Sequence, residues 1–199
     1  MKTISHVYDT YGQARAAVQS LEASGIASRD ISMVANKYVS ERYAHLDEVS
    51  STGAGAGVGA VAGGSAGLLA GLGLVAIPGL GPVVAAGWIA ATAVGAAAGA
   101  VAGATVGGLV GVLQEAGEPE VRAHVYSEAV RRGATLVTAK VADVDAARVR
   151  NILEEHEPID PQRREREFRA EGWQRFDPAA PPYRPSEGEI ERIRMKGYL

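Results

Sequence analysis

The chain has 199 residues and a formal net charge of −3. This length allows one ordinary domain, or a small domain with an appendage. Because the charges nearly balance, there is no basic field of the kind that attracts nucleic acid, and we expect no nucleic-acid partner. The chain contains no cysteine, which excludes disulfides, thiolate nucleophiles and cysteine-based metal sites.

The N-terminal residues predict a β-α-β unit. Residues 4–8 (ISHVY) alternate between apolar and polar side chains, as a strand does, and Asp9-Thr10 can cap a helix. Apolar residues then recur at helical spacing as far as Gly25, a candidate C-cap. Residues 30–34 (DISMV) predict a second strand.

A related pattern returns after about residue 116. Glu118-Pro119 favours the start of a helix that ends at Gly133, and residues 134–141 (ATLVTAKV) predict a strand. A further helix follows Asp143 or Asp145, and a short last strand is expected near residues 158–160. The order of these elements predicts an α+β fold, a small ferredoxin-like α/β sandwich with one extra helix, whose halves are residues 1–50 and 116–160.

The two halves are separated by an insertion, residues 51–115, with no charged side chain between Glu48 and Glu115. Within it, Pro78, Gly79, Gly81 and Pro82 predict a tight turn, because proline and glycine interrupt helices on both sides. The insertion is therefore predicted to be a helical hairpin, with arms at residues 51–77 and 83–113.

Small residues recur at every fourth position in both predicted arms. They are Gly55, Gly59, Gly63, Gly67 and Gly71 in the first arm, and Gly87, Ala91, Gly95, Gly99, Gly103, Gly107 and Gly111 in the second. Four-residue spacing places them near one helix face, where missing side chains let another backbone approach closely. We expect these glycine zippers to mediate helix packing and oligomerisation, with simple low complexity as the alternative explanation.

The length of the arms is compatible with insertion into a membrane, since about 20 helical residues cross the hydrocarbon layer. Lys37 and Arg42 precede the arms and Arg122 follows them, whereas the turn has no basic residue, so both termini are expected in the cytoplasm. The first six residues also lack the apolar core of a secretory signal. The predicted location is the cell membrane, with lipid as a partner; the alternative is a cytoplasmic protein whose hairpin is not inserted.

Two segments flanking the insertion, HVYDTYGQARAAVQSLEASGIASRDISMVAN and VYSEAVRRGATLVTAKVADVDAARVRNILEEH, resemble the general stress protein (YflT-like, heat-induced stress protein) domain. The resemblance covers about residues 3–36 and 116–160. Its most specific part is the GATLVTAKV strand after the helix that contains Tyr126, and GWQRFDPAAPPYRP is similar to tails found with that domain. It implies a bacterial stress-associated protein with no catalytic or ligand residues to transfer. The long insertion departs from the minimal domain.

Few residues suggest chemistry. The four histidines lack metal-ligand spacing, and the acidic cluster around His156 is typical of a solvated helix end. The glycine-rich stretches lack the lysine or acidic partner of a nucleotide-binding loop. We therefore expect no enzyme activity, cofactor, metal site or small-molecule substrate.

Residues 161–199 form a charged, proline-containing tail, predicted to be extended. Its aromatic residues, including Trp173 and Phe176, could pin it to the domain, or it could be disordered. The leading functional hypothesis is a non-enzymatic, stress-associated, membrane-anchored structural or interaction protein that assembles through the glycine-zipper helices. The alternative is a soluble regulatory or ligand-binding module whose hairpin packs on the sheet or on a partner.

Overall fold

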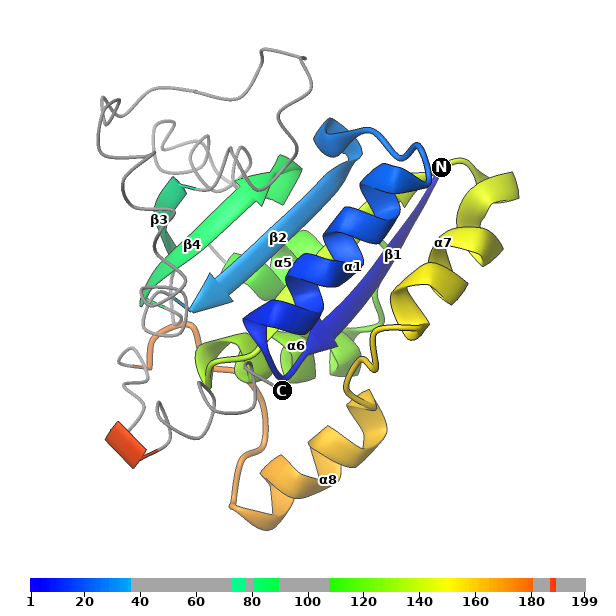
Figure 1. Ribbon diagram of the computed structural model, residues 1–199. Coiled ribbons are helices and arrows are strands. Elements are labelled where there is room, and N and C mark those ends of the chain that lie inside the picture. The colour runs from blue at the N-terminus through cyan, green and yellow to red at the C-terminus, as the bar shows by residue number, and fades with distance from the viewer. Residues whose placement is uncertain (37–72, 78–80, 90–107, 181–186, 189–199) are drawn as a thin grey trace.

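The structure is a computed structural model that describes residues 1–36, 73–77, 81–89, 108–180 and 187–188 (Figure 1). These residues form an antiparallel sheet with helices on both faces. Its strands are β1 (Lys2–Tyr8), β2 (Ile31–Asn36), β3 (Gly73–Ile77), β4 (Gly81–Gly87) and β5 (Thr135–Val141). The helices are α1 (Tyr11–Ala23), α5 (Gly108–Glu115), α6 (Glu120–Arg131), α7 (Ala146–Glu154) and α8 (Pro161–Ala170).

The predicted N-terminal β-α-β pattern is confirmed by β1, α1 and β2. Thr10 caps α1, because its side-chain oxygen accepts a hydrogen bond from the backbone N–H of Gln13. Gly25 follows the helix with a φ of 91°, which glycine adopts without strain. The predicted elements α6, β5 and α7 of the second half are confirmed as well.

The sheet has the strand order β1-β5-β2-β4-β3, and all its neighbouring strands are antiparallel. The predicted α+β class is therefore confirmed. β5 pairs with both β1 and β2, so the strand from the second half of the sequence lies inside the N-terminal β-α-β unit. The two halves of the sequence thus form one sheet.

Two hydrophobic cores lie on opposite faces of the sheet. One contains residues of α1 and α7, and the other contains residues of α5, α6 and α8 (Figure 1). In β2, Met33 belongs to the first core and Val34 to the second. Alternate side chains of a strand point to opposite faces, so every residue of β2 is buried.

The helical hairpin predicted for residues 51–115 is wrong around its turn. Residues Gly73–Ile77 and Gly81–Gly87, placed in the two helical arms and the turn, form β3 and β4. The chain does reverse where the prolines and glycines predict it, because Ile77 pairs with Gly81. Once β4 is paired with β2, the backbone polar groups of this segment are satisfied by the ladder instead of by helical bonds.

In the described residues, the second predicted arm is helical at residues 88–89 and in α5. Leu109 in α5 and Ile89 just after β4 belong to the same hydrophobic core. Because residues 83–87 belong to β4, the prediction that residues 83–113 form one continuous helix is wrong. None of the helices in the described residues is long and apolar enough to span a bilayer.

Two predictions near the C-terminus also need correction. Residues 158–160 are not a strand. The N–H of Ile159 donates a single hydrogen bond to the carbonyl of Val7 in β1 (2.8 Å), and Pro158 has no N–H to donate. The tail is not extended at its start: Asp160 caps α8, where its carboxylate accepts hydrogen bonds from two backbone N–H groups. Phe168 and Phe176 are buried, so residues up to Ala180 include a segment docked on the domain.

Candidate functional site

Most predicted helix-packing residues lie outside the described residues. These are Gly55, Gly59, Gly63, Gly67, Gly71, Ala91, Gly95, Gly99, Gly103 and Gly107, together with Pro78 and Gly79 of the turn. Gly81 and Pro82 belong to β4. Gly111 lies in α5, where an added Cβ would meet no other atom within 4 Å. For these residues the zipper remains a prediction.

Gly87 has a different role from the one predicted. It ends β4 with a φ of 81°, and an added Cβ would lie 2.0 Å from the backbone oxygen of Ile31. Next to it, the Ser32 hydroxyl donates to the carbonyl of Ala86 (2.6 Å) and accepts the N–H of Ile89 (3.2 Å). Gly87 is thus required for the close approach of β4 to β2, a contact that four-residue spacing does not reveal.

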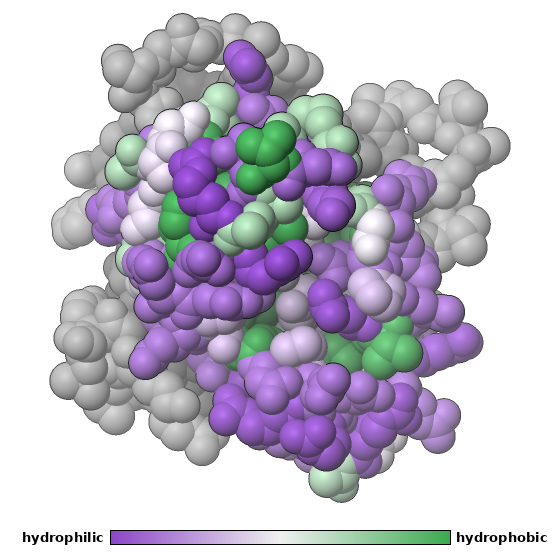
Figure 2. All heavy atoms as spheres, turned by 90° about the vertical axis from the view of Figure 1, so that its right-hand side faces the viewer, coloured by the Kyte–Doolittle hydropathy of each residue, from purple (hydrophilic) through white to green (hydrophobic). Residues whose placement is uncertain are grey.

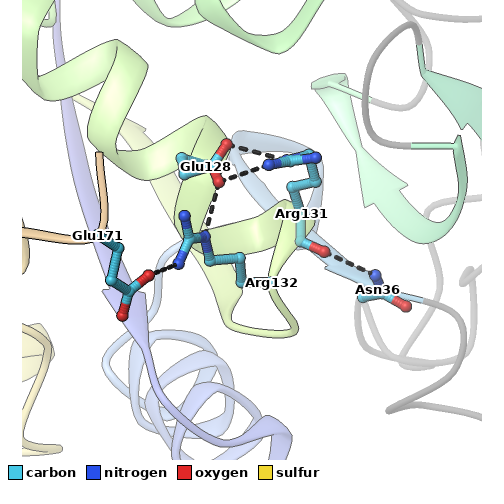
Figure 3. Close-up of polar contacts among 5 residues, drawn as sticks. All are labelled: Asn36, Glu128, Arg131, Arg132 and Glu171. Carbon is cyan, nitrogen blue, oxygen red and sulfur yellow. Dashed lines mark hydrogen bonds and ion pairs between the residues drawn. The ribbon is translucent and has the colours of Figure 1, made fainter. Parts of the chain in front are cut away.

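A buried carboxylate, Glu128 of α6, organises the end of that helix (Figure 3). Its side chain is only 1% exposed and accepts hydrogen bonds from Arg131 and Arg132 at 2.6–2.9 Å. The carbonyl of Arg131 accepts a bond from the side chain of Asn36, the last residue of β2 (3.1 Å). This cluster ties α6 to the point where the chain leaves the sheet for residues 37–72.

Arg132 also connects the Glu128 cluster to α8. Its guanidinium bonds Glu171, just after α8, and lies 4.4 Å from the centre of the Phe168 ring. The arginine therefore joins a buried carboxylate, an exposed carboxylate and an aromatic face. The alternation of arginine and glutamate after Pro161 predicts a solvated segment but gives no indication of this attachment.

A groove of about 490 Å³ runs along the outer edge of β1. Its walls are β1 residues 3–6, the segment before and at the start of α6, one face of α7, and residues 158–161. Glu118 and Arg122 form an ion pair in one wall (3.2 Å), and Arg150 and Glu154 of α7 supply one charge of each sign in the other. Sequence patterns did not predict this groove, because its walls come from segments that are far apart in the chain.

Neutral polar groups line the inner part of this groove. The hydroxyl of Tyr126 donates to the carbonyl of Ser5 (3.4 Å), and burial raises the pKa of Tyr126, so that the phenol stays protonated. Ser5 is 4% exposed, and its hydroxyl has no hydrogen-bond partner among the described residues. Burial lowers the pKa of His6, and the charge of Glu154 opposes this effect. His6 is therefore neutral at neutral pH.

We expect His6→Gln to make stability less dependent on pH. In the folded protein the pKa of His6 is below its ordinary value, so the unfolded chain binds the proton more readily. The stabilisation is complete above about pH 6.5 and is lost as the pH falls through the lower, folded pKa. Urea denaturation at several pH values between 7.5 and 5 measures this, and the wild type should lose more stability than the variant. Parallel curves would contradict the assignment.

Among the residues described, no cluster of three or more histidine or acidic side chains could hold a metal ion. The groove brings together ionisable groups, but it pairs no hydroxyl nucleophile with a base: the Ser5 hydroxyl makes no hydrogen bond, and the Tyr126 hydroxyl donates to a backbone carbonyl. Its geometry suits hydrogen bonding better than covalent catalysis. Comparisons with family models, curated proteins and solved structures found no match for this chain.

Proposed function

We propose that this chain is a non-enzymatic, stress-associated structural or interaction protein that assembles through two charge-free glycine-rich segments, residues 53–72 and 90–107. The pairing of β3 with β4 carries the proposal. Gly73, which follows the first segment, pairs with Ala85, four residues before Ile89, after which the second segment begins. The antiparallel ladder thus holds the end of one segment beside the start of the other.

The proposal keeps the packing of two glycine-rich stripes and changes only the connection between them. In this proposal the two stripes of small residues are joined through the short β-hairpin of β3 and β4 instead of through a helical turn. Faces of glycine and alanine allow backbones to pack closely, either within one chain or against a second copy. The ferredoxin-like assignment and the stress-protein assignment belong to this proposal and are supported by the resemblance of residues 3–36 and 116–160.

The proposal is tested by placing bulk on both stripes. Gly63→Leu combined with Gly99→Leu should disperse the oligomer and leave the thermal unfolding of the α/β domain unchanged, because the added bulk falls on the proposed zipper faces and on no residue of the described strands and helices. Light scattering coupled to size exclusion measures the assembly. The matched control is Ser65→Leu with Ala97→Leu, two residues away and on the opposite side of a helix. An oligomer of wild-type size in the Gly63→Leu/Gly99→Leu variant would contradict the proposal.

The pairing of β4 with β2 favours a second candidate, a soluble regulatory or ligand-binding module whose hairpin packs on its own sheet. The membrane-anchored form is supported by the charge-free run from residue 49 to 114, with both termini cytoplasmic. Carbonate washing of a membrane fraction distinguishes these two. Protein that stays in the pellet supports the lipid-anchored form, and protein released entirely into the supernatant supports the second candidate.

A further inference from the structure

We propose that residues 161–180 form a strap that leaves and rejoins α6 while the sheet stays folded, and that ionic strength sets how often the strap is open. The strap comprises α8 and residues 171–180. The structure shows its closed position, and in the open position it has left α6. The proposal does not depend on the function of the glycine-rich segments.

The strap is held by few buried side chains. Within residues 161–180, Phe168 and Phe176 are the buried side chains, whereas α6 buries seven of its twelve residues. Both phenylalanines belong to the core that contains residues of α5 and α6, and Trp173 packs against that core. Every ordered residue costs conformational entropy, and buried apolar side chains supply most of the compensation. The strap should therefore open at a lower free energy than the sheet.

The strap begins at a fixed joint. Ile159 is 4% exposed, and its N–H bonds the carbonyl of Val7 in β1. The next residue, Asp160, caps α8 by accepting hydrogen bonds from the N–H groups of Gln162 and Arg163. Because this cap is local, α8 can leave α6 without losing it.

Ion pairs link the strap to the rest of the domain. Arg164 pairs with Asp9, just after β1 (2.5 Å), and Glu171 pairs with Arg132, at the end of α6 (Figure 3). Asp9 is 41% exposed and Glu171 is 61% exposed, so dissolved salt screens both pairs. Salt has no comparable effect on the burial of the two phenylalanines. Raised ionic strength therefore favours the open strap.

The closed strap covers a positioned arginine. The guanidinium of Arg132 lies 4.4 Å from the centre of the Phe168 ring and also bonds Glu171. When the strap opens, Arg132 loses these two contacts but keeps its ion pair with the buried carboxylate of Glu128. The open state thus presents a held guanidinium beside newly exposed apolar residues of α6, and the closed state blocks access to them.

Hydrogen exchange of the full chain tests the proposal. Amides of α8 should exchange faster than those of β5 and more slowly than unstructured amides. Between about 50 mM and 0.5 M sodium chloride, the exchange of α8 should accelerate about fivefold while that of β5 stays unchanged. Equal protection of α8 and β5, no protection of α8, or exchange of α8 that is independent of salt would each overturn the proposal.

A charge variant outside the strap separates its attachment from pairs within α8. Asp9→Asn removes the carboxylate that faces Arg164, and it should accelerate exchange of α8 about threefold at low salt and weaken the salt dependence. The matched control is Arg163→Gln, which breaks a pair with Glu167 inside α8 and should leave the salt dependence as in the wild type. The same salt dependence in Asp9→Asn and Arg163→Gln would contradict the proposed control by ionic strength.

A second variant removes one of the two buried side chains of the strap. Phe176→Ala should accelerate exchange of α8 at least about tenfold and change that of β5 much less. Leu153→Ala, in the core on the opposite face of the sheet, is the control and should accelerate exchange of β5. Equal acceleration of α8 and β5 in Phe176→Ala would show that the strap does not open separately from the sheet.

Discussion

Gly87→Ala is expected to lower the free energy of unfolding by about 4 kcal/mol, among the largest effects of any single substitution in the described part of the chain. The backbone φ of 81° disfavours alanine, and the new Cβ would lie 2.0 Å from the oxygen of Ile31 and 2.8 Å from the Cα of Ser32. Neither backbone atom can move without disturbing β2, which is buried on both faces. β4 must therefore separate from β2 or both strands must shift.

Gly25→Ala is the control for Gly87→Ala. Gly25 has a similar φ of 91°, but an added Cβ meets nothing within 4 Å, so only the backbone strain of about 1–2 kcal/mol is expected. Urea denaturation measures both variants. Trp88, whose ring lies 3.7 Å from the Lys140 ammonium, reports detachment of β4 through its fluorescence. Equal losses in the two variants would show that the close approach of β4 is unimportant.

Glu128→Gln is expected to cost about 3 kcal/mol, because it removes the charge that two arginines share inside the protein. Glu128 is 1% exposed, while Arg131 and Arg132 are 19% and 25% exposed, so the arginines are only partly hydrated without it. The loss should also loosen α8, since Arg132 holds Glu171. Thermal unfolding measures the first effect, and hydrogen exchange in α8 measures the second.

Arg163→Gln is the control for Glu128→Gln. It breaks an ion pair with Glu167 in which the two side chains are 59% and 50% exposed, and it should cost about 0.5 kcal/mol or less. A similarly small cost for Glu128→Gln would mean that the Glu128 cluster is not important for stability. Unchanged exchange in α8 would separate the cluster from the docking of the tail.

Figure 2 shows how hydrophilic and hydrophobic residues are distributed over one face of the molecule. Hydrophilic residues cover most of the visible face, and hydrophobic ones appear in small groups between them. In the described part of the chain, Val121 and Val144 are exposed large hydrophobic residues and lie on separate elements. Scattered apolar residues of this kind are normal and do not mark an interface.

The sequence alone predicted the elements in which the local pattern of apolar residues matches the side chains that are buried in the fold. Alternation in residues 4–8, the Thr10 cap, the glycines after α1 and α6, and the strand at residues 134–141 depend on neighbours within a few positions, and the structure confirms them. The cysteine content likewise excluded whole classes of chemistry before any fold was known.

Only the tertiary structure determined which secondary structure residues 73–87 of the central insertion adopt. Residues 73–87 are apolar and glycine-rich, a composition compatible with a buried helix or a buried strand, and local spacing favoured the helix. An unpaired edge of β2 was available, and pairing with it satisfies the backbone groups of β4. Sequence patterns also did not predict the roles of Gly87 and Glu128 or the groove beside β1. Each depends on contacts between residues far apart in the chain, which local periodicity does not encode.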